Sequence, residues 1–219
     1  MMAHMPSPFT ADNAFGWPEQ QERTRIHIPD ARQWLDKGLR EYCGENAVLT
    51  LPHVARDKNG SVKLDSNGNA VKEDTYDEIA KWMDDNDGRG LLCIGGCGLG
   101  KTVICSMILP RLINWYSRLG VKVYNSSELN QKYKEIADYG KTPIVIDDIG
   151  LEHRGKVWGE DLGYVFSGIV DDAEKSGRLL ILTSNLKPEE IYKKYGERTY
   201  DRLLAIVKWV KFEGKSFRK

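Results

Sequence analysis

One glycine-rich segment constrains the possible folds of this chain more than any other feature. It covers residues 95–102, reads GGCGLGKT, and matches the pattern G-x-x-x-x-G-K-[ST]. The apolar run Leu91–Ile94 precedes it, and the helix-compatible stretch VICSMIL follows it. A strand, a tight loop and a helix in this order are the setting in which such a loop holds a nucleoside triphosphate. The four fixed positions arise by chance in about one chain in a hundred of this length, so a plain glycine turn with a surface lysine is the weaker interpretation.

The loop residues have distinct expected roles. The glycines let the backbone turn tightly and direct its N–H groups at phosphate oxygens, and the following helix adds the positive end of its dipole. Lys101 would reach the β- and γ-phosphates, and the Thr102 hydroxyl would ligate Mg²⁺. The expected nucleotide contacts are Gly95, Gly96, Cys97, Gly98, Leu99, Gly100, Lys101, Thr102 and Val103.

Length and composition are those of an ordinary globular protein. The chain has 219 residues, of which 41% are hydrophobic and 29% are charged, and this length suits one domain with an extension. No apolar run approaches the roughly 18 residues that a membrane helix needs. The N-terminus lacks the basic and apolar regions of a secretory signal. We therefore expect a cytoplasmic protein without a membrane segment.

Charge is distributed unevenly, although the net charge is zero. Residues 57–87 carry nine acidic against four basic side chains, and residues 187–219 carry ten basic against five acidic ones. A zero net charge argues against a general binder of polyanions. The basic C-terminal segment fits either a nucleic-acid or acidic partner, or an ordinary solvated surface of mixed charge.

The cysteines indicate free thiols rather than a metal site. They are Cys43, Cys93, Cys97 and Cys105. A cysteine-based zinc site needs a second pair of ligands, and His27, His53 and His153 have no suitable spacing to supply it. Reduced thiols of a cytosolic protein are the better interpretation.

Two regions differ in their pattern. We expect residues 1–75 to form an N-terminal extension, of which residues 1–25 are mobile. It would contain a helix over 30–42 and a small hairpin within 46–72, where two Asn-Gly pairs indicate turns. Residues 76–219 form the expected main domain. In it, short apolar strands at 91–94, 121–125, 142–147, 178–184 and 205–212 alternate with helices at 101–118, 126–138, 160–176 and 188–203. This alternation predicts an α/β fold with a parallel five-stranded sheet and helices on both faces.

Two acidic residues follow one of these strands. Asp147 ends the apolar run IVID and Asp148 comes next. A carboxylate is costly to bury at a strand end unless it meets a cation or a donor. We expect Asp147 to hold Mg²⁺ through water or through Thr102, and Asp148 to orient or deprotonate an attacking water. Two helix-capping carboxylates in a loop are the alternative.

A third polar strand end comes later in the chain. The strand over 178–184 runs into Thr183, Ser184 and Asn185. The Asn185 amide offers a donor and an acceptor together, so it could contact both the γ-phosphate and the attacking water. Turn chemistry ahead of Pro188 is the alternative.

The order of these motifs resembles one family. GGCGLGKT, IVIDDIG, LILTSNL and then GERTYDRLLAIVKWVKFEGKSFR are similar to the AAA+ helicase loaders of the DnaC type and to their transposition relatives, the IstB ATPases. The resemblance covers about 90–219. It implies a RecA-like AAA+ core of the P-loop NTPase class with a minimal or absent C-terminal lid. It also implies ATP and Mg²⁺ as cofactors, ATP hydrolysis, a replicative helicase as partner, contact with single-stranded DNA, and nucleotide-dependent homo-oligomers.

The same resemblance assigns roles to two arginines. Arg202, in the DRL segment, would act as a finger on the nucleotide of a neighbouring subunit, and Arg218 would act as a second sensor. A guanidinium suits phosphate oxygens in shape and charge. Arg198 lies four residues before Arg202, so one helix face would present both, and the sequence leaves open which acts. Ion pairing on a solvated helix is the alternative for each.

We therefore expect an ATPase of DNA replication, in which Lys101, Asp148, Asn185 and Arg202 carry the chemistry and Thr102 and Asp147 hold the metal. Three other functions remain open from the sequence. The first is an IstB-like helper of transposition, which would share the site chemistry. The second is a small-molecule P-loop kinase, and the third is a nucleotide-dependent binding module with negligible turnover.

Overall fold

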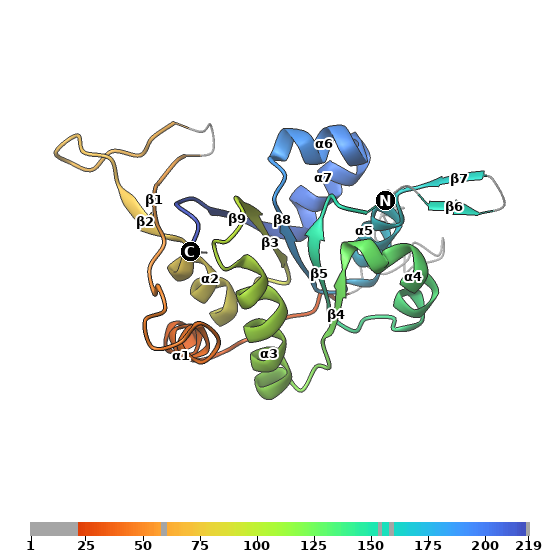
Figure 1. The fold of residues 1–219 in the computed structure, drawn as a ribbon, viewed down its shortest axis with the longest axis horizontal. Helices are drawn as coiled ribbons and strands as arrows, with labels where there is room; N and C mark the ends of the chain where they lie inside the picture. Colours follow the sequence, from red (N-terminus) through yellow and green to blue (C-terminus); the bar gives the residue numbers. More distant parts are fainter. Residues whose placement is uncertain (1–21, 58–60, 153–154, 158–159, 218–219) are drawn as a thin grey trace, which may run out of the picture.

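A computed structural model describes residues 22–57, 61–152, 155–157 and 160–217. Its centre is a five-stranded sheet in which every neighbouring pair is parallel. Figure 1 shows this sheet between helices. In spatial order its strands are β4 (Lys122–Asn125), β5 (Ile144–Ile149), β8 (Leu180–Ser184), β3 (Gly90–Gly95) and β9 (Val207–Phe212). The expected parallel five-stranded sheet of an α/β P-loop fold is confirmed.

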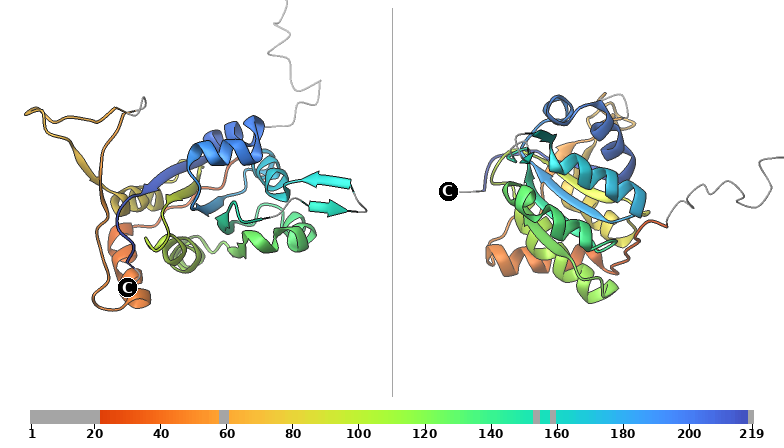
Figure 2. Two further views of the ribbon diagram at one scale, coloured as in Figure 1. Left: turned by 45° about the horizontal axis from the view of Figure 1, so that its top comes forward. Right: turned by 90° about the vertical axis from the view of Figure 1, so that its right-hand side faces the viewer.

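Helices cover both faces of the sheet, as expected (Figure 2). One face packs against α1 (Ala31–Cys43), α2 (Thr75–Asp84), the π-helix η1 (Val103–Ile108) and α3 (Leu109–Ser117). The other packs against α4 (Leu129–Asp138), α5 (Val165–Ser176), α6 (Pro188–Tyr195) and α7 (Glu197–Ile206). Successive strand residues serve opposite layers: Leu91 and Cys93 face the first, Leu92 and Ile94 the second. This explains why the strands are apolar without a polar alternation.

Several expected helix boundaries differ in the structure. The helix after the glycine loop contains the π-helical stretch η1 after its first two residues, and a 3₁₀ turn, η2 (Ser126–Glu128), precedes α4. The helix expected over 160–176 starts only at Val165, because β6 (Gly155–Val157) and β7 (Glu160–Gly163) form a hairpin that the periodicity did not indicate. The helix expected over 188–203 is divided at Gly196, whose φ of 83° ends α6.

The N-terminal part combines a packed helix with a projecting arm. α1 shares a hydrophobic cluster with β3 and η1. The expected hairpin is present as the arm, residues 52–74, in which β1 (Pro52–Val54) pairs with β2 (Lys72–Asp74). Isolated bridges at Arg56–Val62 and Leu64–Ala70 continue the pairing outward. The arm extends away from the body (Figure 2), and the Asn59-Gly60 turn lies outside the described residues. A domain boundary at residue 75 stays a prediction.

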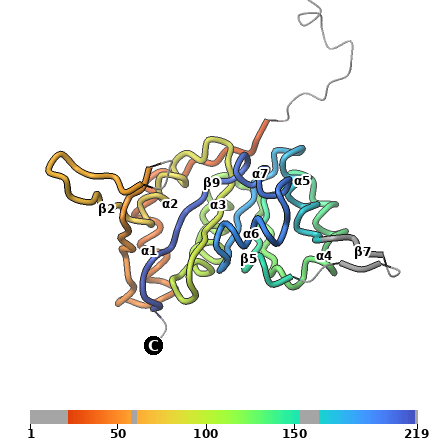
Figure 3. Tube along the Cα trace, turned by 90° about the horizontal axis from the view of Figure 1, so that it is seen from above, coloured from red at the N-terminus to blue at the C-terminus, as the bar shows by residue number. Residues whose placement is uncertain are grey.

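The chain ends beside the glycine loop. Within the described part, no helix follows β9. In the view of Figure 3 the last segment runs from β9 toward the side of the molecule on which α1 lies, and the main-chain N–H of Phe217 donates to Gly98 O at 2.9 Å. Among the described residues no helix is long and apolar enough to cross a membrane.

We expect Gly90→Ala to lower the free energy of unfolding by about 2 kcal/mol or more, because strands β3 and β8 approach too closely there for a side chain. A Cβ at Gly90 would lie 2.1 Å from Leu180 O and 3.0 Å from Val207 Cγ1. Urea unfolding followed by circular dichroism measures the change. The matched control is Gly120→Ala, whose Cβ would meet nothing within 4 Å and should shift stability by at most about 0.5 kcal/mol. Equal effects of the two substitutions would contradict this packing.

Candidate nucleotide site

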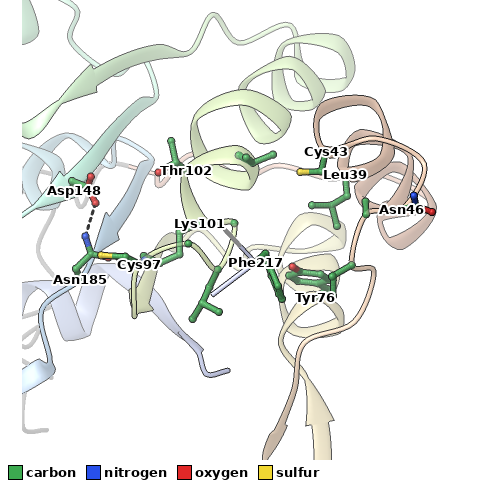
Figure 4. Close-up of a pocket in the computed structure, with 16 residues that line it drawn as sticks. Leu39, Cys43, Asn46, Tyr76, Cys97, Lys101, Thr102, Asp148, Asn185 and Phe217 are labelled. Carbon is green, nitrogen blue, oxygen red and sulfur yellow. Dashed lines mark hydrogen bonds between the residues drawn. The ribbon is translucent and has the colours of Figure 1, made fainter. Parts of the chain in front are cut away.

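A cavity of about 730 Å³ lies at the carboxyl end of β3. Open α/β sheets bind ligands at this edge. Figure 4 shows two ends: Asp148 and Asn185 on one side of Lys101, and Leu39, Tyr76 and Phe217 on the other. The lining residues are Leu39, Cys43, Asn46, Ala47, Val48, Tyr76, Cys97, Gly98, Leu99, Gly100, Lys101, Thr102, Val103, Asp148, Asn185 and Phe217. The cavity therefore has a polar end and a largely apolar end.

The glycine loop wraps around the Lys101 ammonium. Gly98 and Gly100 have φ of 77° and 89°, which only glycine adopts without strain. Lys101 is 5% exposed, and its Nζ donates to Gly95 O at 2.8 Å, to Gly96 O at 2.7 Å and to Asn185 Oδ1 at 2.8 Å. Burial lowers the pKa of Lys101 from its ordinary value, while nearby Cys97 and Asp148 oppose that effect. The ammonium is thus held at the strand edge, with donors directed at oxygen acceptors.

Asp147 connects the glycine loop to two strands. Its Oδ1 accepts the Thr102 hydroxyl at 3.1 Å and the Thr183 hydroxyl at 2.6 Å. Adjacent oxygens in an octahedral Mg²⁺ shell lie about 2.9 Å apart. The spacing of Thr102 Oγ1 and Asp147 Oδ1 therefore fits two neighbouring ligands of such an ion, and the hydroxyl and carboxylate oxygens are of the kind that Mg²⁺ prefers.

Asp148 has an unusual backbone conformation. Its φ is 57°, in the left-handed region that non-glycine residues seldom adopt. The pairing of β5 with β8 shifts register between Ile146 and Ile149, as in a bulge. The Asp148 N–H donates to Thr183 Oγ1 at 2.8 Å, and its carbonyl accepts the Ser126 hydroxyl at 2.6 Å. These bonds hold the strained turn, which brings consecutive carboxylates to one edge of the sheet.

Asn185 joins the two halves of the polar end. Its Oδ1 accepts from Lys101, and its Nδ2 donates to Asp148 Oδ1 at 3.0 Å. The amide therefore uses its acceptor and its donor on two other expected site residues. The structure brings Lys101, Thr102, Asp147, Asp148 and Asn185 together from three strand ends, as the sequence predicts. Their roles in binding and catalysis stay predictions.

The two arginines lie apart from this cluster. Arg202 does not line the cavity. It is held on α7 by Asp171 and by Glu174 Oε2, the latter 2.7 Å from its Nε, both on α5. Arg198 NH2 lies 3.0 Å from the same Asp171. Both arginines are thus ion-paired, but with α5 rather than with Glu190, Glu197 or Asp201, the partners expected under the alternative. Pairing on the same subunit does not oppose a role toward a neighbour. Arg218 lies outside the described residues.

Sequence reasoning missed the supporting residues. The sequence places Thr183 at a polar strand end, but it does not indicate that its hydroxyl contacts both Asp147 and Asp148. No sequence pattern indicates a role for Ser126, because the carbonyl that it bonds, that of Asp148, is 22 residues away. Tyr76, the second residue of α2, is 1% exposed but reaches the cavity wall. The alternation of apolar and polar residues along the chain does not reveal these positions, because the contacts of each are with residues far away in the sequence.

Similarity to known proteins is found among solved structures only, and it concerns the fold. No protein-family model matches this chain, and no curated protein matches it. Similar solved structures include the DnaC helicase loader, at 19% identity over 57% of this chain and 79% of that chain, with a TM-score of 0.47. They also include DnaI, at 19% identity over 59% and 73% with a TM-score of 0.47. Another is AMPPCP-bound DnaA from Aquifex aeolicus, at 17% identity over 64% and 47% with a TM-score of 0.46.

At 17–19% identity these likenesses concern the fold alone. Because these TM-scores are below 0.5, the function of this chain has to follow from its own residues.

Proposed function

We propose that this protein is an ATPase that binds ATP with Mg²⁺ between the glycine loop and the acidic end of β5. The observation that carries the proposal is the convergence of Lys101, Thr102, Asp148 and Asn185 at one end of a 730 Å³ cavity, with Asp147 bonded to Thr102 beside them. An ammonium, a hydroxyl, two carboxylates and an amide are the donor and acceptor set that a metal-bound triphosphate requires.

Each polar residue then has one task. Lys101 would exchange its carbonyl acceptors for phosphate oxygens and neutralise their charge. Thr102 and Asp147 would hold Mg²⁺, which when bound spreads the charge of the β- and γ-phosphates. Asp148 would accept a proton from the attacking water. Asn185, bonded to both Lys101 and Asp148, would position that water relative to the phosphate.

The apolar end supplies a surface for a flat base. Leu39, Val48 and Phe217 line it, together with the ring of Tyr76. Phe212 packs against Tyr76, with ring centroids 6.4 Å apart. Aromatic and aliphatic side chains favour a planar heterocycle. The proposal therefore places the adenine toward α1 and the chain end.

The cellular role we propose is in DNA replication, as a cytoplasmic helicase loader that assembles with its own copies when ATP is bound. The sequence resemblance to DnaC-type loaders over about 90–219 supports this role. The five excess basic charges of residues 187–219, ten basic against five acidic, support contact with single-stranded DNA. An IstB-like role in transposition would use the same site with another partner.

Lys101→Ala and Asp148→Asn should separate binding from turnover. Lys101→Ala removes the buried charge that faces the phosphates, so we expect no measurable ATP binding. Asp148→Asn retains the shape and removes the base, so ATP should bind while hydrolysis falls by about a hundredfold or more. Calorimetry with ATP and Mg²⁺ measures binding, and phosphate release measures turnover; chelation of Mg²⁺ should stop turnover in the unmodified protein.

The control is Lys175→Ala, which removes a lysine at the end of α5, outside the cavity. It should leave ATP binding and turnover unchanged. Absence of ATP binding by the folded, unmodified protein would remove the proposed function.

Arg202→Ala should bind ATP normally and lose the hydrolysis that assembly stimulates, because a finger acting in trans is worth about 10³–10⁵ in rate. Arg198→Ala is the matched comparison, since Arg198 shares Asp171 but has a side chain 73% exposed against 20% for Arg202. Mixing Arg202→Ala subunits with Lys101→Ala subunits should restore turnover, because each supplies what the other lacks. No restoration, or full activity of Arg202→Ala alone, would oppose coupling through this residue.

Affinity capture from source cells should identify the partner. We expect a replicative helicase to be retained with a non-hydrolysable ATP analogue and with Asp148→Asn as bait, and to be lost with Lys101→Ala. Capture of a transposase under the same conditions would instead support the transposition role. Phosphate transfer to a small metabolite would support the kinase alternative, and turnover that neither DNA nor any partner stimulates would support the binding module.

A further inference from the structure

A second cluster of ligand-type side chains lies at the base of the arm, outside the nucleotide cavity. It consists of His53 on β1, Glu73 on β2 and Glu78 on α2. His53 and Glu73 face each other as a cross-strand pair, and His53 Nε2 lies 3.0 Å from Glu78 Oε1. One ligand atom from each of the three residues lies within 4.8 Å of the other two. Three separate elements thus direct an imidazole and two carboxylates at one point.

The hydrogen bonds around His53 determine which nitrogen faces this point. The Thr75 hydroxyl donates to Lys211 O at 3.0 Å, so it can only accept from His53 Nδ1, which lies 3.3 Å away. In the neutral imidazole the proton therefore sits on Nδ1, and Nε2 presents a lone pair toward Glu78. Two acceptors cannot face each other at 3.0 Å unless a proton or a metal cation lies between them.

The surroundings match those of a metal-binding histidine. Such a histidine donates its other ring N–H to an oxygen that fixes the ring, and here the oxygen is Thr75 Oγ1. The His53 and Glu78 side chains are only 11% and 24% exposed. The Glu73 side chain is 42% exposed and also meets Lys63 Nζ at 3.5 Å, so Lys63 is the cation with which a metal would compete. Lys208 donates to the main-chain oxygen of Glu78 at 3.3 Å, and its charge also acts on the Glu78 carboxylate.

We propose that His53, Glu73 and Glu78 form a binding site for a zinc ion, with a water as the fourth ligand. One nitrogen and two carboxylate oxygens are ligands that Zn²⁺ accepts in tetrahedral sites. Ligand atoms around Zn²⁺ lie about 3.3 Å apart for bonds of this length, so the exposed Glu73 side chain completes the shell by a small rotation. Linear spacing along the chain did not indicate the site, because the hairpin and α2 bring the ligands together.

The bound ion would fasten the arm to the body. His53 and Glu73 belong to the two strands of the arm, whereas Glu78 belongs to α2. α2 also carries Tyr76, which lines the cavity described above. The proposal is independent of ATP hydrolysis, since none of its residues lines that cavity.

Zinc titration of the untagged full-length protein tests the site, by calorimetry in the presence of excess Mg²⁺. We expect a single zinc ion to bind, and His53→Ala and Glu73→Gln each to weaken binding at least tenfold. Thermal unfolding should shift upward with Zn²⁺ in the unmodified protein and not in His53→Ala, because a ligand that binds only the folded state stabilises it. Glu73→Gln alters a side chain that is 42% exposed, so it keeps the test informative if His53→Ala fails to fold.

Two control variants distinguish this site from others. His27→Ala removes an exposed histidine paired with Asp84, and Asp147→Asn removes the proposed magnesium ligand. Both should bind Zn²⁺ as the unmodified protein does. Co²⁺ in place of Zn²⁺ should give a spectrum without thiolate bands, which excludes the exposed thiols of Cys43 and Cys97. Unchanged zinc affinity in His53→Ala or Glu73→Gln, or no zinc binding by the unmodified protein, would overturn the proposal.

Discussion

The carboxylate of Asp147 holds together the three segments on which the candidate site depends. It accepts the hydroxyl of Thr102, at the start of the helix after the glycine loop, and that of Thr183 on β8. Thr183 in turn receives the main-chain N–H of Asp148. Bonds to a charged acceptor are stronger than those between neutral groups. This arrangement aligns the ends of β3, β5 and β8, so the glycine loop and the acidic residues meet at a defined separation.

The strained backbone at Asp148 is followed by a loop that is held by hydrogen bonds. A left-handed conformation costs about 1–3 kcal/mol for a residue with a side chain. Behind it, the buried Glu152 accepts the Gly150 N–H at 2.8 Å and the Tyr195 hydroxyl. Tyr195 packs against Phe166 with ring centroids 4.8 Å apart. The loop after the strained turn is therefore bonded to the helical layer through Glu152 and Tyr195.

The cavity owes its apolar end to segments far apart in the chain. Leu39 on α1, Tyr76 on α2 and Phe217 after β9 come together there. The arm begins at the same place, since Asp74 Oδ1 accepts the N–H groups of both Leu51 and Tyr76. The start of α2 therefore connects the nucleotide cavity with the cluster at the base of the arm.

The sequence by itself determined the strands, the glycine loop and the order of the polar strand ends. These depend on local apolar runs and on glycine spacing, which are legible over fewer than ten residues. It did not indicate the β6–β7 hairpin, although Gly159 and Gly163 flank the first residues assigned to the helix over 160–176 and glycine disfavours a helix interior. Gly196 stands within a segment that is otherwise periodic, so the sequence did not indicate that α6 ends there.

Only the tertiary structure decided how neighbouring side chains are directed. Consecutive residues of a regular strand face opposite sides, so IVIDD alone leaves Asp147 and Asp148 pointing apart. The irregular pairing of β5 with β8 brings both to one edge. The packing of α7 on α5 likewise pairs Arg202 with Asp171, and the hairpin places Glu73 beside His53. Each of these contacts joins residues at least 20 positions apart, and their energies depend on burial and geometry that no local pattern contains.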